Sequence, residues 1–380
     1  MTKHLVVIGA GTGGLMVANH VARQLSREIE RGEVSVTLLG DRDEYLYQPG
    51  LLYVAFDLMR PQELIRKIPN LLSPGIKFIK ERAARIDPKG QTVQTESGRQ
   101  VPFDYLVLAT GSDLNLAETP GLKEGGHWFY TLDGAVKLRE ALKQFQGGRV
   151  VVAIGLPHKC PVAPLEFTLM FDEWARERGI RDKTEIIYTF PINRAHSIEP
   201  VADWASQEFE RRSITLETFF NLESVDPVKR EVSSLEGTTF QYDLLVTIPA
   251  HAGDRLGKDS GLAEAGNWLP THRHSLQVGD YANIFAVGDA TNLPVSKAGS
   301  VAHFEAEVIS ENLVRLLTGG SAAHQYHGKA FCFIEAGLDK ATYITFDYTT
   351  PPVVTPPTQA IHWFKQSYNR VHWLNLKGIV

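Results

Sequence analysis

Cysteine is scarce in this chain of 380 residues, where Cys160 and Cys332 are the only two. No spacing of cysteine and histidine resembles a zinc site, so the sequence predicts no metal centre. No stretch approaches the roughly 18–20 apolar residues that a membrane-spanning helix requires. Lysine and arginine form no block and the net charge is -5, so we expect no nucleic-acid partner.

A secretory signal is missing as well. Met1 is followed almost at once by the apolar stretch 5–8, whereas a signal needs a basic segment and a longer apolar core before its cleavage site. We therefore expect the protein on the cytoplasmic side, without export. A structural disulfide is disfavoured in a reducing compartment, which leaves the two cysteines as buried apolar thiols or as reactive groups.

A strand–glycine–helix pattern, which opens a βαβ unit, occurs twice, at 5–14 and at 149–160. Short strands are expected in 76–105 around a turn at Asp87, and a similar turn stands at Asp226. The sequence thus predicts an α/β fold with two Rossmann-like dinucleotide-binding domains that carry inserted β-meanders. The expected bounds are 1–112 with 255–320 for the first domain, 113–254 for the second, and 321–380 for a C-terminal region.

The first glycine turn forms a GxGxxG motif with Gly9, Gly11 and Gly14, between a strand and a helix. Such glycines let the backbone approach a pyrophosphate at the helix N-terminus. A glycine turn without a ligand is the alternative. In this fold a carboxylate after the second strand holds the ribose hydroxyls. Gly40 occupies the expected position, so the next residue, Asp41, is the candidate.

Two further strands end in motifs that distinguish FAD from NAD. One strand ends in Ala109-Thr110-Gly111, and a later one ends in Gly288-Asp289. Together with the first glycine turn, they resemble the pyridine nucleotide–disulfide oxidoreductase superfamily. The resemblance implies FAD as the cofactor, with Asp289 accepting hydrogen bonds from its ribityl and pyrophosphate region.

The second glycine turn is degenerate. It runs from Gly155 to Pro161 and keeps only its first glycine, because proline and bulky side chains stand where a pyrophosphate would approach. A nicotinamide cofactor is therefore not expected here. Cys160 occupies this turn instead, directly before a helix, and a helix N-terminus lowers the pKa of a thiol. We therefore predict that Cys160 is reactive.

A cysteine in this turn, then "LPVSKAG", then Cys332 in "CFIEAG", resembles sulfide:quinone oxidoreductase. The related flavocytochrome c sulfide dehydrogenase flavoprotein shares much of the pattern. The resemblance implies that Cys160 and Cys332 flank the flavin, bridged directly or through extra sulfur. It also implies oxidation of sulfide to sulfane sulfur or polysulfide, with two electrons passing through FAD to a membrane quinone.

The chain departs from these relatives at two places. Some members carry a third cysteine before the second nucleotide fold, where this sequence has Tyr130. The flavocytochrome flavoproteins attach FAD through a cysteine near the first ribose loop, but the corresponding stretch "DEYLYQPGLL" has none. We therefore expect FAD to be bound non-covalently, which favours quinone over cytochrome c as the acceptor.

Proton transfer needs further groups beside the cysteines. Glu166 follows Cys160 by nearly two helical turns and is one candidate, although a surface acid is the alternative. His196 is a weaker candidate. Lys297 and Gly299 stand in "LPVSKAG", and the resemblance places that lysine near the flavin, where it stabilises the reduced anion.

The end of the chain, 360–380, mixes aromatic and cationic side chains, including Trp363, Phe364 and Lys365. Such a mixture suits a membrane interface, and the segment is too short to span. We predict peripheral, monotopic membrane contact here. Docking on the protein's own body or on a partner chain is the alternative, and the sequence leaves open whether a homo-oligomer forms.

Three other functions remain open at this stage. A sulfide dehydrogenase would pass electrons to a cytochrome c. A type II NADH:quinone oxidoreductase shares the architecture but needs an intact second glycine turn. A flavin-bound redox sensor would use the cysteines as a switch without turnover.

Overall fold

The computed structural model describes residues 1–379. The molecule has two halves, and the first half, which includes segments from both ends of the chain, is built on a parallel sheet of order β19-β9-β1-β2-β5. The interior of this sheet is apolar on both faces, as expected for parallel strands covered by other elements. The strands are β1 (Lys3–Ile8), β2 (Val34–Leu39), β5 (Ile76–Ile79), β9 (Tyr105–Leu108) and β19 (Ile284–Ala286).

Helices α1 (Thr12–Gln24) and α9 (Gly299–Leu317) pack against each other in this half. Asp87 forms the predicted turn, because its carboxylate accepts the N–H groups of Lys89 and Gly90. Smaller elements complete the half: α2 (Ser26–Glu30), β3 (Glu44–Leu46), α3 (Leu51–Ala55), β4 (Ile65–Lys67), and a meander of β6 (Ala83–Asp87), β7 (Thr92–Thr95) and β8 (Gln100–Pro102).

The second half repeats the plan with a parallel sheet of order β13-β12-β11-β17. Its strands are β11 (Gly148–Ile154), β12 (Thr184–Phe190), β13 (Thr215–Thr218) and β17 (Leu244–Ile248). Its helices are α4 (Leu122–Gly125), α5 (Leu132–Gln144), α6 (Ala163–Glu177) and α7 (Glu199–Arg212), and its meander is β14 (Leu222–Asp226), β15 (Glu231–Ser234) and β16 (Thr239–Gln241). The predicted α/β fold with two Rossmann-like sheets is confirmed.

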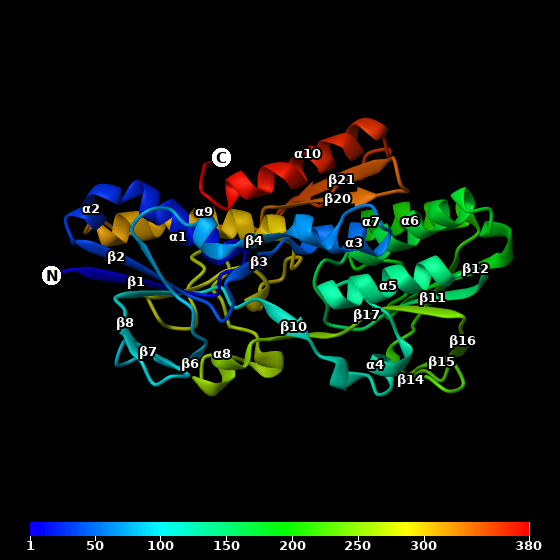
Figure 1. Ribbon diagram of the computed structural model, residues 1–380, viewed down its shortest axis with the longest axis horizontal. Coiled ribbons are helices and arrows are strands. Elements are labelled where there is room, and N and C mark those ends of the chain that lie inside the picture. The colour runs from blue at the N-terminus through cyan, green and yellow to red at the C-terminus, as the bar shows by residue number, and fades with distance from the viewer. Residues whose placement is uncertain (380) are drawn as a thin grey trace.

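A short antiparallel pair, β10 (Ser112–Leu114) with β18 (His251–Gly253), connects the halves, and α8 (Arg255–Asp259) follows it. The chain then ends in a hairpin of β20 (Ala330–Glu335) and β21 (Ala341–Phe346) and in α10 (Gln359–Asn375). Figure 1 shows the two sheets side by side, with α10 lying over the hairpin along the upper edge. Among residues 1–379, no helix is both long and apolar enough to cross a membrane.

The buried carboxylate of Asp172 connects α6 to neighbouring segments through ion pairs with arginines. Asp172 is fully buried and accepts hydrogen bonds from Arg176, Arg181 and Arg212, at 3.0, 2.5 and 3.0 Å. Burial opposes ionisation, but the three guanidinium groups hold the pKa of Asp172 below its usual range. Arg212 also donates to the carbonyl of Ala336, directly after β20. The cluster therefore anchors the C-terminal hairpin to the second half.

Replacing Asp172 by asparagine keeps the size of the side chain but removes its charge. We expect the free energy of unfolding to fall by about 3 kcal/mol, because buried charges lose their partner. Chemical denaturation measures this loss. The control is Glu185→Gln, which breaks the exposed pair with Arg149 and should change the value by less than about 1 kcal/mol. Equal losses in the two variants would contradict the interpretation.

Candidate functional site

One cavity of about 480 Å³ lies where the carboxyl ends of both central sheets meet the hairpin and α10. Its volume falls within the range of ligand pockets in proteins, roughly 300–1,000 Å³. The sequence-predicted residues that line it are Gly9, Gly11, Asp41, Ala109, Thr110, Gly111, Cys160, Glu166, Gly288, Asp289, Lys297, Gly299 and Cys332. Gly14 and His196 do not line it.

The first glycine turn presents free backbone to this cavity. A Cβ added to Gly11 would meet no atom within 4 Å, whereas one on Gly9 would lie 2.2 Å from the carbonyl oxygen of Ala109. Gly14 is needed for packing instead, because its Cβ would lie 1.9 Å from the carbonyl oxygen of Gly9. Only Gly11 of the three therefore opens directly toward a ligand.

Two long helices begin at the cavity without a capping side chain. Gly11 is the N-cap of α1 and Ala298 is the N-cap of α9, and neither helix carries an acid in its first turn. A Cβ on Gly299 would also meet no atom within 4 Å. The unpaired N–H groups and the partial positive charge of each helix end suit an anionic group. These features fit a dinucleotide that carries a pyrophosphate.

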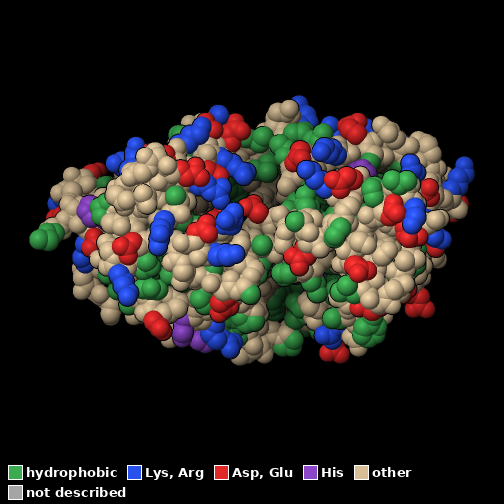
Figure 2. Space-filling view, turned by 90° about the horizontal axis from the view of Figure 1, so that it is seen from below, with side chains coloured by type: hydrophobic (Ala, Val, Ile, Leu, Met, Phe, Trp, Pro, Cys, Tyr) green, Lys and Arg blue, Asp and Glu red, His purple; other side chains and the backbone are tan. Residues whose placement is uncertain are grey.

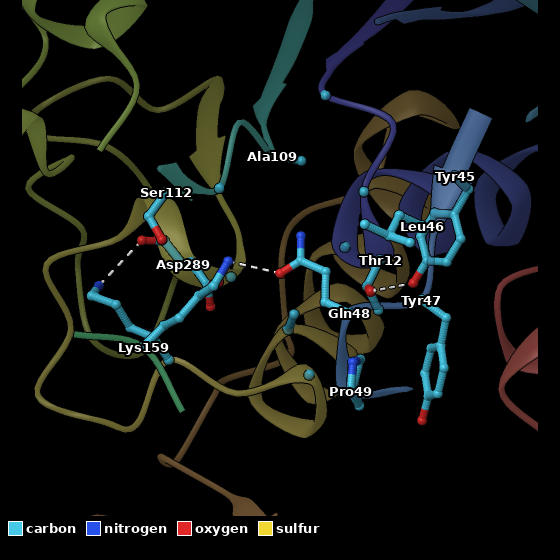
Figure 3. A pocket seen from close by; sticks show the side chains of 18 of the residues that line it. Thr12, Tyr45, Leu46, Tyr47, Gln48, Pro49, Ala109, Ser112, Lys159 and Asp289 are labelled. Atoms are coloured by element: carbon cyan, nitrogen blue, oxygen red, sulfur yellow. Dashed lines mark hydrogen bonds and ion pairs between the residues drawn. The ribbon is translucent and has the colours of Figure 1, made fainter. Parts of the chain in front are cut away.

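Polar side chains from both halves meet between these helices. Lys159 Nζ donates to Gln48 Oε1 at 2.7 Å and lies 4.0 Å from Asp289 Oδ2 (Figure 3). The Tyr130 hydroxyl donates to the carbonyl of Lys159 at 3.2 Å. Sequence reasoning missed Lys159 and Gln48, because they are 111 positions apart and only the fold joins them. Nothing except the neighbouring Cys160 could have pointed to Lys159.

The predicted ribose acid lies at an open end of the cavity. The Asp41 side chain is 47% exposed, and its oxygens lie 3.8 Å from guanidinium nitrogens of Arg42 and Arg82. The carboxylate is therefore accessible to hydroxyl groups of a ligand but is only loosely held by its neighbours.

Lys297 holds two segments of the site together. Its Nζ donates to the carbonyls of Asp289 and Thr291 at 3.2 and 2.5 Å and lies 4.1 Å from the centre of the Trp268 ring. Burial lowers the pKa of Lys297, and the negative charge of Asp289 partly offsets this decrease. The carbonyl of Lys297 also accepts the N–H of Cys160 at 2.8 Å. The lysine therefore sits between the nucleotide end and the cysteine end of the cavity.

Both cysteines open onto this cavity as free thiols. Cys160 has a left-handed backbone conformation, φ 51°, which is uncommon outside glycine. Burial, with the charge of Glu166, raises the pKa of Cys332 to about 12 and also raises that of Cys160. The prediction that the helix N-terminus lowers the pKa of Cys160 is wrong. Helix α6 begins only at Ala163, Cys332 is buried and Cys160 is partly buried, and both thiols lie near the Glu166 carboxylate.

Glu166 is not a surface acid. It is 6% exposed, and its Oε1 accepts the backbone N–H of Glu335 at 2.9 Å and a hydrogen bond from Lys365 Nζ. Burial raises the pKa of Glu166, and Lys365 opposes the increase. Glu335 in turn accepts from the hydroxyl of Tyr53 and pairs with His362 at 2.9 Å. A network of charged groups therefore lies directly behind the cysteines.

His196 lies outside the cavity lining, completely buried in the second half. Its Nδ1 accepts the N–H of Ile198 at 3.0 Å, and its Nε2 has no partner among residues 1–379. Burial lowers its pKa to about 4, so the ring is neutral at physiological pH. His196 lies near the backbone of Pro161, next to Cys160, but its ring does not line the cavity, so we do not retain it as a proton carrier.

Helix α10 has its polar side turned inward. The Tyr47 hydroxyl donates to Asn369 Oδ1 at 2.6 Å, and the hydroxyl of Tyr45 lies 2.6 Å from His372 Nε2. Lys365 was expected at a membrane surface but is buried in the network instead. The outward side is mostly apolar, with exposed Trp363, Phe364, Val371 and Leu374, and it also carries the exposed Ser367 and Arg370. Residues 1–379 contain no cluster of histidine, cysteine and acidic side chains able to hold a metal.

Residues 3–306 match the family described as pyridine nucleotide-disulphide oxidoreductase. The chain belongs to this family. Mouse mitochondrial sulfide:quinone oxidoreductase is 26% identical to this oxidoreductase over 387 residues, covering 98% of this chain and 83% of the mouse protein. The sulfide-quinone reductase of Aquifex aeolicus is 26% identical over 395 residues, covering 97% of this chain and 90% of that protein.

The fold of this oxidoreductase is also found among solved structures. The X-ray structure of the Aquifex aeolicus sulfide:quinone oxidoreductase superposes on it with a TM-score of 0.87. The superposition covers 99% of this chain and 92% of that chain, at 24% identity. The shared fold therefore includes the hairpin that carries Cys332 and helix α10, which lie beyond the residues matched by the family.

Gly11→Val tests the dinucleotide site of this oxidoreductase. The added side chain enters the open space at the start of α1 without touching the protein, so thermal stability of the flavin-free chain should not change. The affinity for added FAD should fall at least about tenfold, or roughly 1.4 kcal/mol. Flavin fluorescence quenching measures the affinity. An unchanged affinity would exclude the turn as the pyrophosphate site.

Proposed function

We propose that the protein is an FAD-dependent sulfide:quinone oxidoreductase. It oxidises sulfide to sulfane sulfur or polysulfide through Cys160 and Cys332 and passes two electrons to a membrane quinone. The observation that carries this proposal is that two cysteines 172 positions apart open onto the same cavity as a dinucleotide-type glycine turn. Relatives named sulfide:quinone oxidoreductase, matched over nearly the whole chain, support it.

The chain offers a complete set of contacts for FAD. The amides that follow Gly11 can hold the pyrophosphate, Asp41 the adenosine ribose, and Asp289 the ribityl region. The lining contains no cysteine apart from Cys160 and Cys332, which supports non-covalent binding of the cofactor. When bound, FAD supplies the two-electron acceptor for the thiols.

The cysteines perform the sulfur chemistry. The two thiols lose two electrons and two protons in forming a disulfide. Hydrosulfide then attacks one of the two sulfur atoms, which leaves a persulfide on one cysteine and a thiolate on the other. Because burial raises the pKa of both thiols, a nearby group must take their protons. Glu166, whose pKa burial also raises, can hold a proton at its carboxylate beside them.

Quinone enters beneath α10. Phe331 and Tyr368 both line the cavity there, with ring centres 5.2 Å apart, and offer apolar walls to a planar ring. The NADH alternative is disfavoured because the second glycine turn keeps only Gly155, and Cys160 and proline stand where a pyrophosphate would approach the backbone. Neither a cytochrome c acceptor nor a sensor function is favoured by any contact in the site.

The apolar outward side of α10 attaches the protein to the lipid surface in which quinone dissolves, on the cytoplasmic side. Trp363 and Phe364 are each 64% exposed, and Leu374 is 44% exposed. Figure 2 views the opposite face, where charged side chains of both signs are spread over the surface. This difference between the two faces supports peripheral attachment through α10.

Anaerobic stopped-flow absorbance tests the reaction. Sulfide should bleach the flavin of the holoenzyme, and a soluble quinone analogue should restore it. Because both sulfur atoms are needed, Cys160→Ser and Cys332→Ser should each slow bleaching by about 10³-fold or more. Bleaching by NADH but not by sulfide would place the protein with NADH dehydrogenases. A single cysteine oxidation without turnover would favour the sensor.

The attachment is tested with a triple variant that changes Trp363, Phe364 and Leu374 to serine. Each apolar side chain contributes about 1.5–3 kcal/mol on burial, so binding to phospholipid vesicles should weaken about a hundredfold or more. Vesicle flotation measures binding. Val228→Ser with Leu235→Ser, exposed on the β14–β15 meander, is the matched control. Sulfide should bleach both variants normally, and unchanged flotation of the triple variant would refute the proposal.

A further inference from the structure

The two cysteines lie on segments that are far apart in the sequence and are held near each other only by non-covalent contacts. Cys160 lies in the loop before α6, and Cys332 lies in β20. The nearest link between these elements is the hydrogen bond from the backbone N–H of Glu335 to Glu166 Oε1, at 2.9 Å. Glu166 follows Cys160 by six residues and Glu335 follows Cys332 by three. This contact therefore joins the two cysteine-bearing segments close to both thiols.

Helix α10 also takes part in this contact. Lys365 of α10 pairs with Glu166 Oε1 and lies 3.6 Å from Glu335 Oε1, with only 8% of the residue exposed. We call Glu166, Glu335 and Lys365 the clasp. Tyr53 and His362 form the side-chain hydrogen bonds to Glu335. The clasp thus joins α6, β20 and α10 at one point behind the cavity.

The cation is what allows the two carboxylates to share this space. Two buried carboxylates repel each other, and each loses hydration when it is buried. Lys365 offsets both effects, so the segments of Glu166 and Glu335 can remain together. Without the ammonium group, one carboxylate has to move toward water or take up a proton, and its segment shifts with it. The separation of the cysteines would then change.

We propose that Lys365 is a positioning residue that sets the separation of Cys160 and Cys332. This inference rests on the proposed use of the two cysteines as a redox pair. It gives the C-terminal helix a second function, because the same helix presents its apolar side outward and reaches the sulfur site with its inward lysine.

Phenylarsine oxide tests the separation without requiring sulfide turnover. One arsenic atom binds two neighbouring thiols as a cyclic dithioarsonite and releases one water, whereas a single thiol holds it weakly. The reduced holoenzyme should therefore bind one arsenical per chain through both cysteines. Lys365→Met should weaken this binding by about 10²-fold, the effect expected when a reacting pair is misplaced by about 1 Å. Titration followed by intact-protein mass spectrometry measures it.

Lys365→Met leaves two buried carboxylates unpaired and can lose the fold, so Glu166→Gln with Lys365→Met is the second variant. It removes a like charge together with the cation, so it should keep the melting temperature. The ammonium group that bridges the side chains at positions 166 and 335 is still missing, so arsenical binding should remain weakened. Lys365→Arg should restore binding. Arg370→Met removes an exposed cation of the same helix and should leave binding unchanged.

Wild-type arsenical binding in the double variant would overturn the inference, and so would a loss in Lys365→Arg as large as in the double variant. A wild-type holoenzyme that does not bridge arsenic would overturn it too, since the thiols would not be neighbours. The proposed function fails differently. If sulfide does not bleach the flavin although arsenic bridges the thiols, the function is wrong and the clasp remains.

Discussion

The ion pair between Lys365 and Glu166 is the contact on which the arrangement of the site depends. A buried pair of this kind adds little to stability on balance, because both groups lose their hydration. Its value lies in geometry, since a buried charge tolerates only positions in which a partner is present. Three elements far apart in sequence, α6, β20 and α10, therefore have one acceptable arrangement around it.

The end of the cavity that suits a nucleotide is formed by strand ends and helix N-termini rather than by an ion pair. Two parallel sheets place their carboxyl ends toward a common space, and α1 and α9 begin there with uncapped N–H groups. In open α/β sheets, ligands bind in the crevice at the carboxyl ends of the strands. Lys297 joins this end to the sulfur end, because it contacts the Asp289 turn with its side chain and the Cys160 loop with its carbonyl.

Sequence patterns predicted the parts of the site that are local. The glycine turn at Gly11, the two parallel sheets and the aspartate turns depend on neighbouring residues, so their spacing is visible in the chain. The thiol pKa was predicted in the wrong direction, since the charge of Glu166 and the depth of burial come from segments remote from Cys160. Lys365 was misplaced for a similar reason, because a helix pattern does not say which side faces the body.

The sequence by itself determined the α/β class, the glycine turn for a dinucleotide and the identity of the two sulfur atoms. These features rest on backbone conformation and short spacings, which act over a few residues. Only the tertiary structure decided that Cys160 and Cys332 share a cavity and that Glu166 is buried between them and Lys365. Those outcomes depend on packing between segments more than a hundred residues apart, and no spacing along the chain encodes them.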